Sequence, residues 1–78
     1  MILTSCSGYS DKEKAYYRNG YNFEQNNPYM QTIADTFGEE AVWESFKEQF
    51  KGVEDEAQYE KAFIEGFNDA LSGKKCKY

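Results

Sequence analysis

Apolar and polar residues follow one another along the chain with the three- and four-residue spacing of amphipathic helices. The first such segment opens with the letters SDKE, in which Ser10 and Glu13 have the spacing of a capping box. A helix is therefore predicted from Asp11 to about Phe23. Its inner face is expected to carry Ala15, Tyr16, Gly20 and Phe23.

Two further helices are predicted between residues 27 and 52. The residue before a proline is pushed out of the helical region, so the letters NNP end the first helix. Asn27 is expected to be the N-cap of the second helix, with Pro28 in its first turn. The second helix is expected to end at Gly38, and the third to run from Glu39 until Gly52 closes it. Their apolar positions are Tyr29, Met30, Ile33 and Phe37 in the second helix, and Val42, Trp43, Phe46 and Phe50 in the third.

A fourth helix is predicted from about Glu54 to Leu71. Its inner stripe is expected to be Tyr59, Ala62, Phe63, Gly66, Phe67 and Ala70. The small residues at every fourth position, Ala62, Gly66 and Ala70, are expected to let a neighbouring helix approach closely. No turn dipeptide joins two runs of alternating apolar residues, so strands are not expected. The predicted fold is all-α, a small bundle of three or four short helices in one domain over residues 10–73.

Aromatic side chains are expected to supply most of the core. The 78 residues include 7 Tyr, 6 Phe and 1 Trp, and each ring buries a large area and packs favourably against other rings. A chain of this length has room for one small domain. Histidine is absent, which removes the commonest general base and the commonest metal ligand.

Charge is distributed unevenly around a formal net charge of −5. The body is acidic, whereas residues 74–78, with the letters KKCKY, form a basic tail. An acidic body argues against direct nucleic-acid binding, which depends on neutralising phosphates. Glu40, Glu44 and Glu48 recur at every fourth residue, and we call them the acidic ridge. Like charges at this spacing destabilise a helix, so the ridge is interpreted either as a surface for a partner protein with a basic face or as a solvated face.

Two tyrosines, Tyr17 and Tyr21, lie beside the predicted inner face of the first helix. Tyrosine is enriched in protein interfaces, so one interpretation is a partner-binding surface. The other interpretation is an aromatic core that extends further round the helix.

The first and last helices share a run of residues. EKAYYRNGYN begins at Glu13 and EKAFIEGFN begins at Glu60. With one gap, both read Glu-Lys-Ala, two large apolar residues, then glycine, an aromatic residue and asparagine. A duplicated helical hairpin would produce such an echo, and so would the ordinary use of good helix formers.

The letters RNGY, NPYMQT and GFNDA resemble short bacterial and phage proteins of the ribosome modulation factor type. The resemblance depends on Gly20, Tyr21, Pro28 and Tyr29, and it covers residues 12–32 and the last helix. It implies a helix that leads through a Pro-Tyr turn to a second helix, and association with ribosomes. Members of that family are basic because they bind ribosomal RNA, whereas this chain is acidic.

The letters LTSC, which end at Cys6, resemble the lipobox of bacterial lipoproteins. This resemblance implies that Cys6 is lipidated and becomes the mature N-terminus, with residues 1–9 as a signal remnant and tether. The expected location is then the cell envelope, with membrane contact only through the lipid on Cys6.

The sequence also allows two alternatives to lipidation of Cys6. A disulfide between Cys6 and Cys76 would close a long loop and add on the order of 4 kcal/mol in the chain-entropy model. The remaining alternative is two free thiols in a cytoplasmic protein. Lipidation and the disulfide exclude each other, because both use the sulfur of Cys6.

No residue pattern predicts catalysis or a cofactor. Acid–base catalysis needs two carboxyl groups with separated pKa values in a pocket, and the paired carboxylates here are expected on solvated helix faces. The patterns of the calcium loop, the phosphate loop, the nucleophile elbow and Cys-x-x-Cys are all missing. The sequence therefore predicts a non-enzymatic protein-binding module of bacterial or phage origin, tethered through Cys6. The alternative is a cytosolic acidic inhibitor that mimics nucleic-acid charge.

Overall fold

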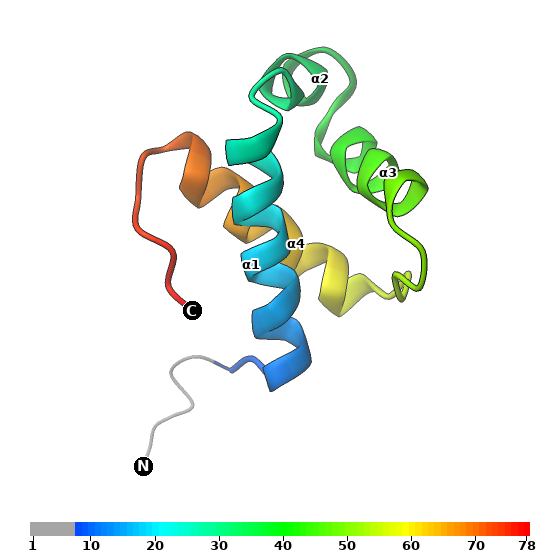
Figure 1. The fold of residues 1–78 in the computed structure, drawn as a ribbon, viewed down its shortest axis with the longest axis vertical. Helices are drawn as coiled ribbons and strands as arrows, with labels where there is room; N and C mark the ends of the chain where they lie inside the picture. The colour runs from blue at the N-terminus through cyan, green and yellow to red at the C-terminus, as the bar shows by residue number, and fades with distance from the viewer. Residues whose placement is uncertain (1–7) are drawn as a thin grey trace.

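The computed structural model describes residues 8–78, which fold into four helices (Figure 1). They are α1 (Asp11–Asn26), α2 (Met30–Phe37), α3 (Glu39–Gln49) and α4 (Ala57–Leu71). No strand occurs in the described part of the chain. The prediction of a small all-α bundle is confirmed.

The start of α1 is fixed by its capping box. The Ser10 hydroxyl accepts a hydrogen bond from the Glu13 backbone N–H at 3.2 Å, and the Glu13 carboxylate accepts one from the Ser10 N–H at 2.8 Å. These two bonds satisfy backbone donors that have no partner within the first turn of a helix. The predicted start of the helix at Asp11 is confirmed.

The boundary between α1 and α2 differs from the prediction. The Asn27 side-chain amide donates to the Phe23 carbonyl at 3.1 Å, and the Asn27 backbone N–H donates to the same carbonyl at 2.9 Å. Asn27 therefore caps the end of α1, and the prediction that it caps the start of the second helix is wrong. α2 begins at Met30, after a turn.

α1 and α4 cross in the middle of the molecule, where each contributes a glycine (Figure 1). A Cβ atom on Gly20 would overlap the carbonyl oxygen of Phe63, and a Cβ atom on Gly66 would overlap that of Tyr17. The two backbones therefore touch, which a residue with a side chain would prevent. The close approach predicted at Gly66 is confirmed. The shared runs of the two helices meet here. In α1, Gly20 comes three residues after Tyr17, and in α4, Gly66 comes three residues after Phe63. Each glycine contacts the aromatic residue of the other helix.

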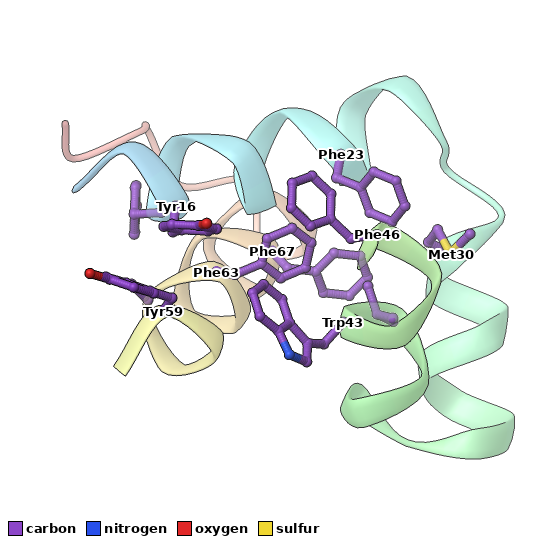
Figure 2. Close-up of a cluster of buried hydrophobic side chains, with 11 residues drawn as sticks. Tyr16, Phe23, Met30, Trp43, Phe46, Tyr59, Phe63 and Phe67 are labelled. Carbon is purple, nitrogen blue, oxygen red and sulfur yellow. The ribbon is translucent and has the colours of Figure 1, made fainter. Parts of the chain in front are cut away.

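Aromatic rings from α1, α3 and α4 fill the core (Figure 2). The centroid of the Phe63 ring lies 4.6 Å from that of Phe46 and 5.2 Å from that of Trp43. Phe23 packs edge-on against Phe46 at 5.5 Å. Such ring pairs each contribute about 0.5–1.5 kcal/mol beyond the area that they bury. The expected aromatic-rich core is confirmed.

Three of the predicted apolar positions are about half exposed to solvent or more. Only Met30 is buried in α2, while Phe37 is 70 % exposed and Tyr29 is 57 % exposed. Phe50 is 49 % exposed, because α3 ends at Gln49 and the Phe50 backbone is extended. The inner faces predicted for the second and third helices are therefore wrong at these positions.

The basic tail, residues 74–78, folds back along α1 and α4 (Figure 1). The Tyr21 hydroxyl donates to the Lys74 carbonyl at 2.5 Å, and the Lys77 N–H donates to the Tyr17 hydroxyl at 3.2 Å. The Tyr78 ring packs edge-on against Tyr17 at 5.1 Å. The tail thus belongs to the folded domain and covers one side of α1.

Candidate functional site

The acidic ridge lies on the outer side of α3. Glu40, Glu44 and Glu48 are all exposed, whereas Val42 and Trp43 on the other side of the helix are buried. A helix places every fourth residue on nearly the same face, so the three carboxylates form one line. The predicted exposure of the ridge agrees with the structure.

A single lysine beside the ridge is shared between two carboxylates. Lys47 Nζ lies 3.0 Å from Glu44 Oε2 and 2.8 Å from Asp55 Oδ2. Trp43 Nε1 donates to the other oxygen of Asp55 at 3.1 Å. The hydrogen bonds from Lys47 and Trp43 lower the pKa of Asp55. Lys47 therefore pairs with one carboxylate of the ridge, that of Glu44, and divides its charge between Glu44 and Asp55.

Glu60 of α4 extends the negative surface beyond α3. Partial burial raises the pKa of Glu60, and the charges of Glu40 and Asp55 raise it further. A carboxyl group becomes harder to ionise next to like charges. Burial is the larger cause of this shift in pKa, and the neighbouring carboxylates of Glu40 and Asp55 add to it.

Tyr17 is not on the surface, and the expectation that it forms part of a partner-binding surface is wrong. Its side chain is fully buried, and its hydroxyl donates to Asp69 Oδ2 at 2.5 Å. Burial and this bond raise the pKa of Tyr17. The physical reason is that α4 covers one side of α1 and the tail covers another. Tyr21 is half-buried, and its hydroxyl is held by Lys74.

A hollow of about 380 Å³ opens between α1, the end of α3 and the loop that follows α3. Its aromatic lining consists of Tyr16, Phe23, Phe46 and Phe50. Phe50 packs against Phe46 with centroids 4.9 Å apart, yet half of its surface remains exposed at the hollow. The hollow therefore combines a buried aromatic floor with a ring that is open to solvent.

Asparagines of α1 and of its C-cap form the polar wall of this hollow. The wall contains Asn19, Asn22, Asn26 and Asn27. The first three are exposed, and they recur on one side of the helix at intervals of three and four residues. Each carboxamide offers both a donor and an acceptor. The wall can therefore bind groups that donate and accept hydrogen bonds along a line.

The loop after α3 closes the hollow through residues 51–53. The Glu54 N–H, next along the loop, donates to the Tyr16 hydroxyl at 2.8 Å. Together with the bonds from Trp43 and Lys47 to Asp55, this contact sets the path of the loop. Lys51 lines the hollow, whereas no Asp or Glu in the described part of the chain does so.

Sequence reasoning did not identify the hollow. Its position depends on where α3 ends and on contacts between residues that are distant in the sequence. One local signal was available, because asparagine is a poor helix former and four asparagines lie between positions 19 and 27.

Lipidation of Cys6, a disulfide between Cys6 and Cys76, and two free thiols all stay predictions. Cys76 is exposed on the tail, and Cys6 lies outside the described residues. Among residues 8–78, no helix is long and apolar enough to cross a membrane. The same residues contain no group of three or more Cys, Asp or Glu side chains placed to hold a metal ion.

No family model matches this chain. Comparison with curated proteins gives no match, and comparison with solved structures gives none either. The resemblances to a lipobox and to ribosome modulation factors therefore stay predictions, and function is argued from the geometry.

Proposed function

We propose that this chain is a non-enzymatic protein-binding module. The observation that carries this proposal is the hollow of about 380 Å³ with the half-exposed Phe50 ring at its edge. Aromatic side chains at pockets supply much of the binding energy in protein interfaces. A ring left open beside a hollow is therefore a suitable anchor point for a partner.

The acidic ridge supports the same proposal. Exposed charges of one sign attract a partner with the opposite charge and speed its association. The ridge is on the outer side of α3, whereas the hollow lies where α3 meets α1. A partner with a basic surface is thus drawn toward α3 by the ridge and held at the hollow.

Partner capture with two matched variants tests the proposal. Phe50→Ala removes the ring at the hollow, whereas Phe37→Ala removes an even more exposed ring on α2. We expect the unaltered chain and Phe37→Ala to retain the same protein from extracts of the source cells, and Phe50→Ala to lose it. Circular dichroism establishes that both variants are folded. Equal capture by both variants would contradict a role for the hollow.

The proposal includes a lipid anchor on Cys6, which would place the module at the cell envelope. Lipidation adds mass, so an intact-mass measurement on protein made from its own locus, with upstream DNA included, tests it. A species that starts at Cys6 and carries acyl chains supports the anchor. A species that starts at Met1 with unmodified cysteines contradicts it. A mass lower by two hydrogen atoms indicates a disulfide with Cys76 instead.

A second candidate function is favoured by the exposure of Glu40, Glu44 and Glu48. A cytosolic inhibitor could mimic nucleic-acid charge and occupy a basic groove. Its affinity would fall steeply with salt, and the double substitution Glu40→Lys with Glu44→Lys would abolish binding. Binding through the hollow instead persists at high salt and depends on Phe50.

A further inference from the structure

The lining of the hollow indicates which chemical group it binds. We propose that it takes an extended peptide segment of the partner, with one large apolar side chain inserted and a carboxylate beside that side chain. This inference rests on the proposed function and specifies the chemistry of the partner.

The floor of the hollow favours an apolar anchor. The rings of Tyr16, Phe23 and Phe46 form it, and Phe50 stands at the rim. The Tyr16 hydroxyl accepts a hydrogen bond from the Glu54 N–H, and the Tyr16 residue lines the hollow. A volume of about 380 Å³ accommodates one large side chain and part of its main chain. An aromatic anchor gains most here, because ring pairs add to the energy of burial.

The asparagine wall matches the repeat of an extended peptide. Asn22 and Asn26 are four residues apart in α1, which separates them by about 6 Å along the helix axis. In an extended chain, main-chain groups that face the same way recur about every 6.7 Å. Each carboxamide can pair with a peptide C=O and N–H at once. Asn19 extends the row at its N-terminal end and lies about 4.5 Å from Asn22 along the helix axis.

The charge of the lining determines what lies beside the anchor. The chain carries a formal net charge of −5, yet among residues 8–78 Lys51 is the only charged residue that lines the hollow. A basic group placed there would meet Lys51 without a compensating carboxylate. A carboxylate on the peptide meets the lysine directly, which gives the segment its preferred orientation.

The dipeptide N-acetyl-Asp-Trp-N-methylamide is a small probe that combines a peptide main chain, a large apolar side chain and a carboxylate. It is titrated into the isotope-labelled full chain and followed by two-dimensional NMR. We expect the side-chain amide signals of Asn19, Asn22 and Asn26 to shift. Asn22→Ala is expected to weaken binding about fivefold, the value of one hydrogen bond. Gln31→Ala, an exposed position on α2, is the matched control and leaves the affinity unchanged.

A second titration tests the charge preference. N-acetyl-Lys-Trp-N-methylamide is expected to bind about threefold more weakly, a difference within the range of an exposed ion pair. Lys51→Ala is expected to remove this difference while the Asn22 dependence remains. Both substitutions are on the surface, so the variants keep the fold of the unaltered chain.

Three results overturn the inference. The first is the absence of any shift at millimolar dipeptide. The second is binding that Asn22→Ala does not weaken, which makes the hollow only an apolar depression. The third is displacement of the dipeptide by N-acetylglucosamine with the same amide signals shifted, which makes the hollow a saccharide site.

The proposed function and this inference fail separately. If partner capture depends on Phe50 but the dipeptide gives no shift, the inference fails and the protein-binding function stands. If the dipeptide binds through Asn22 but capture does not depend on Phe50, the peptide chemistry stands and the proposed role of the hollow in partner binding fails.

Discussion

The two sides of this molecule are packed in different ways. At the crossing of α1 and α4, Gly20 and Gly66 let backbone touch backbone, and the tail seals the side of α1. On the side of α2 and α3, Phe37 and Phe50 are about half exposed to solvent or more, and a hollow lies open. We therefore expect the crossing to contribute most to stability, whereas exposed aromatic surface lies near α3.

This difference has an energetic basis. A chain of 78 residues buries a modest fraction of its surface, and its net stability is on the order of 5 kcal/mol. Apolar surface can be left exposed at the hollow only because the crossing and the aromatic core are tightly packed.

The largest effect is expected from Gly66→Ala. The added Cβ would overlap the Tyr17 carbonyl, and backbone cannot move aside as a flexible side chain can. Overpacking typically costs about 1–3 kcal/mol, and because the overlap here is with backbone, we expect the upper end of that range, which is a large part of the total. We expect chemical denaturation to show that the variant is already unfolded, or about half unfolded, before any denaturant is added.

Gly73→Ala provides the control for this substitution. Gly73 has a φ of 74°, and a Cβ there would meet open space. Only the left-handed backbone penalises alanine, at a cost of about 1 kcal/mol. Equal losses at Gly66 and Gly73 would mean that the crossing contributes no more than an ordinary turn.

A smaller effect is expected from Tyr17→Phe. The change leaves Asp69, which is 7 % exposed, without its 2.5 Å donor, and it leaves the Lys77 N–H without its acceptor. Buried polar groups that lose a partner cost about 1–3 kcal/mol. Thermal unfolding measures the loss. Tyr29→Phe removes the hydroxyl of an exposed tyrosine and is expected to change stability by less than about 0.5 kcal/mol.

Alkaline pH gives a second readout for Tyr17. Its pKa is raised in the folded chain, so the neutral hydroxyl contributes stability below the ordinary tyrosine pKa of about 10. That contribution is lost as the pH rises through the folded value. The unaltered chain is expected to lose stability above about pH 10, and Tyr17→Phe to lose less over the same interval. Identical pH profiles would show that the Tyr17 hydroxyl is not protected by the fold.

The sequence was sufficient for features that depend on local signals. The capping box at Ser10 and Glu13 gave the start of α1, and the small residues around Gly66 gave the close helix approach. The burial of Tyr17 could not be predicted in the same way. Tyr17 is buried because two segments, α4 and residues 74–78, pack against different sides of α1. The periodicity of apolar residues predicts one buried face of a helix, not two.

The hollow escaped prediction for a related reason. Its rim exists because α3 stops at Gln49 and Asp55 is bonded by Trp43 and Lys47. Those bonds depend on the folded core, and no periodic pattern in the sequence indicates them. The acidic ridge, in contrast, was visible because a helix alone places its three glutamates in line.

The smallest effect is expected on the open side, and it has the opposite sign. Asn22 is an exposed position within α1, where alanine is a better helix former by about 0.5 kcal/mol. If the asparagine wall has no structural role, Asn22→Ala raises the melting temperature by about 2–4 °C for a domain of this size. Gln58→Ala on α4, also exposed, is expected to gain less, because glutamine is already a good helix former.

This gain distinguishes a binding surface from a structural one. Residues retained for function commonly cost stability, and their replacement stabilises the chain while activity is lost. Asn22→Ala should therefore melt later and bind the dipeptide more weakly in the same preparation. A lower melting temperature would mean that the carboxamide stabilises α1 or the loop after α3. The row of asparagines would then belong to the fold, as the glycines of the crossing do, and the contrast between the two sides would disappear.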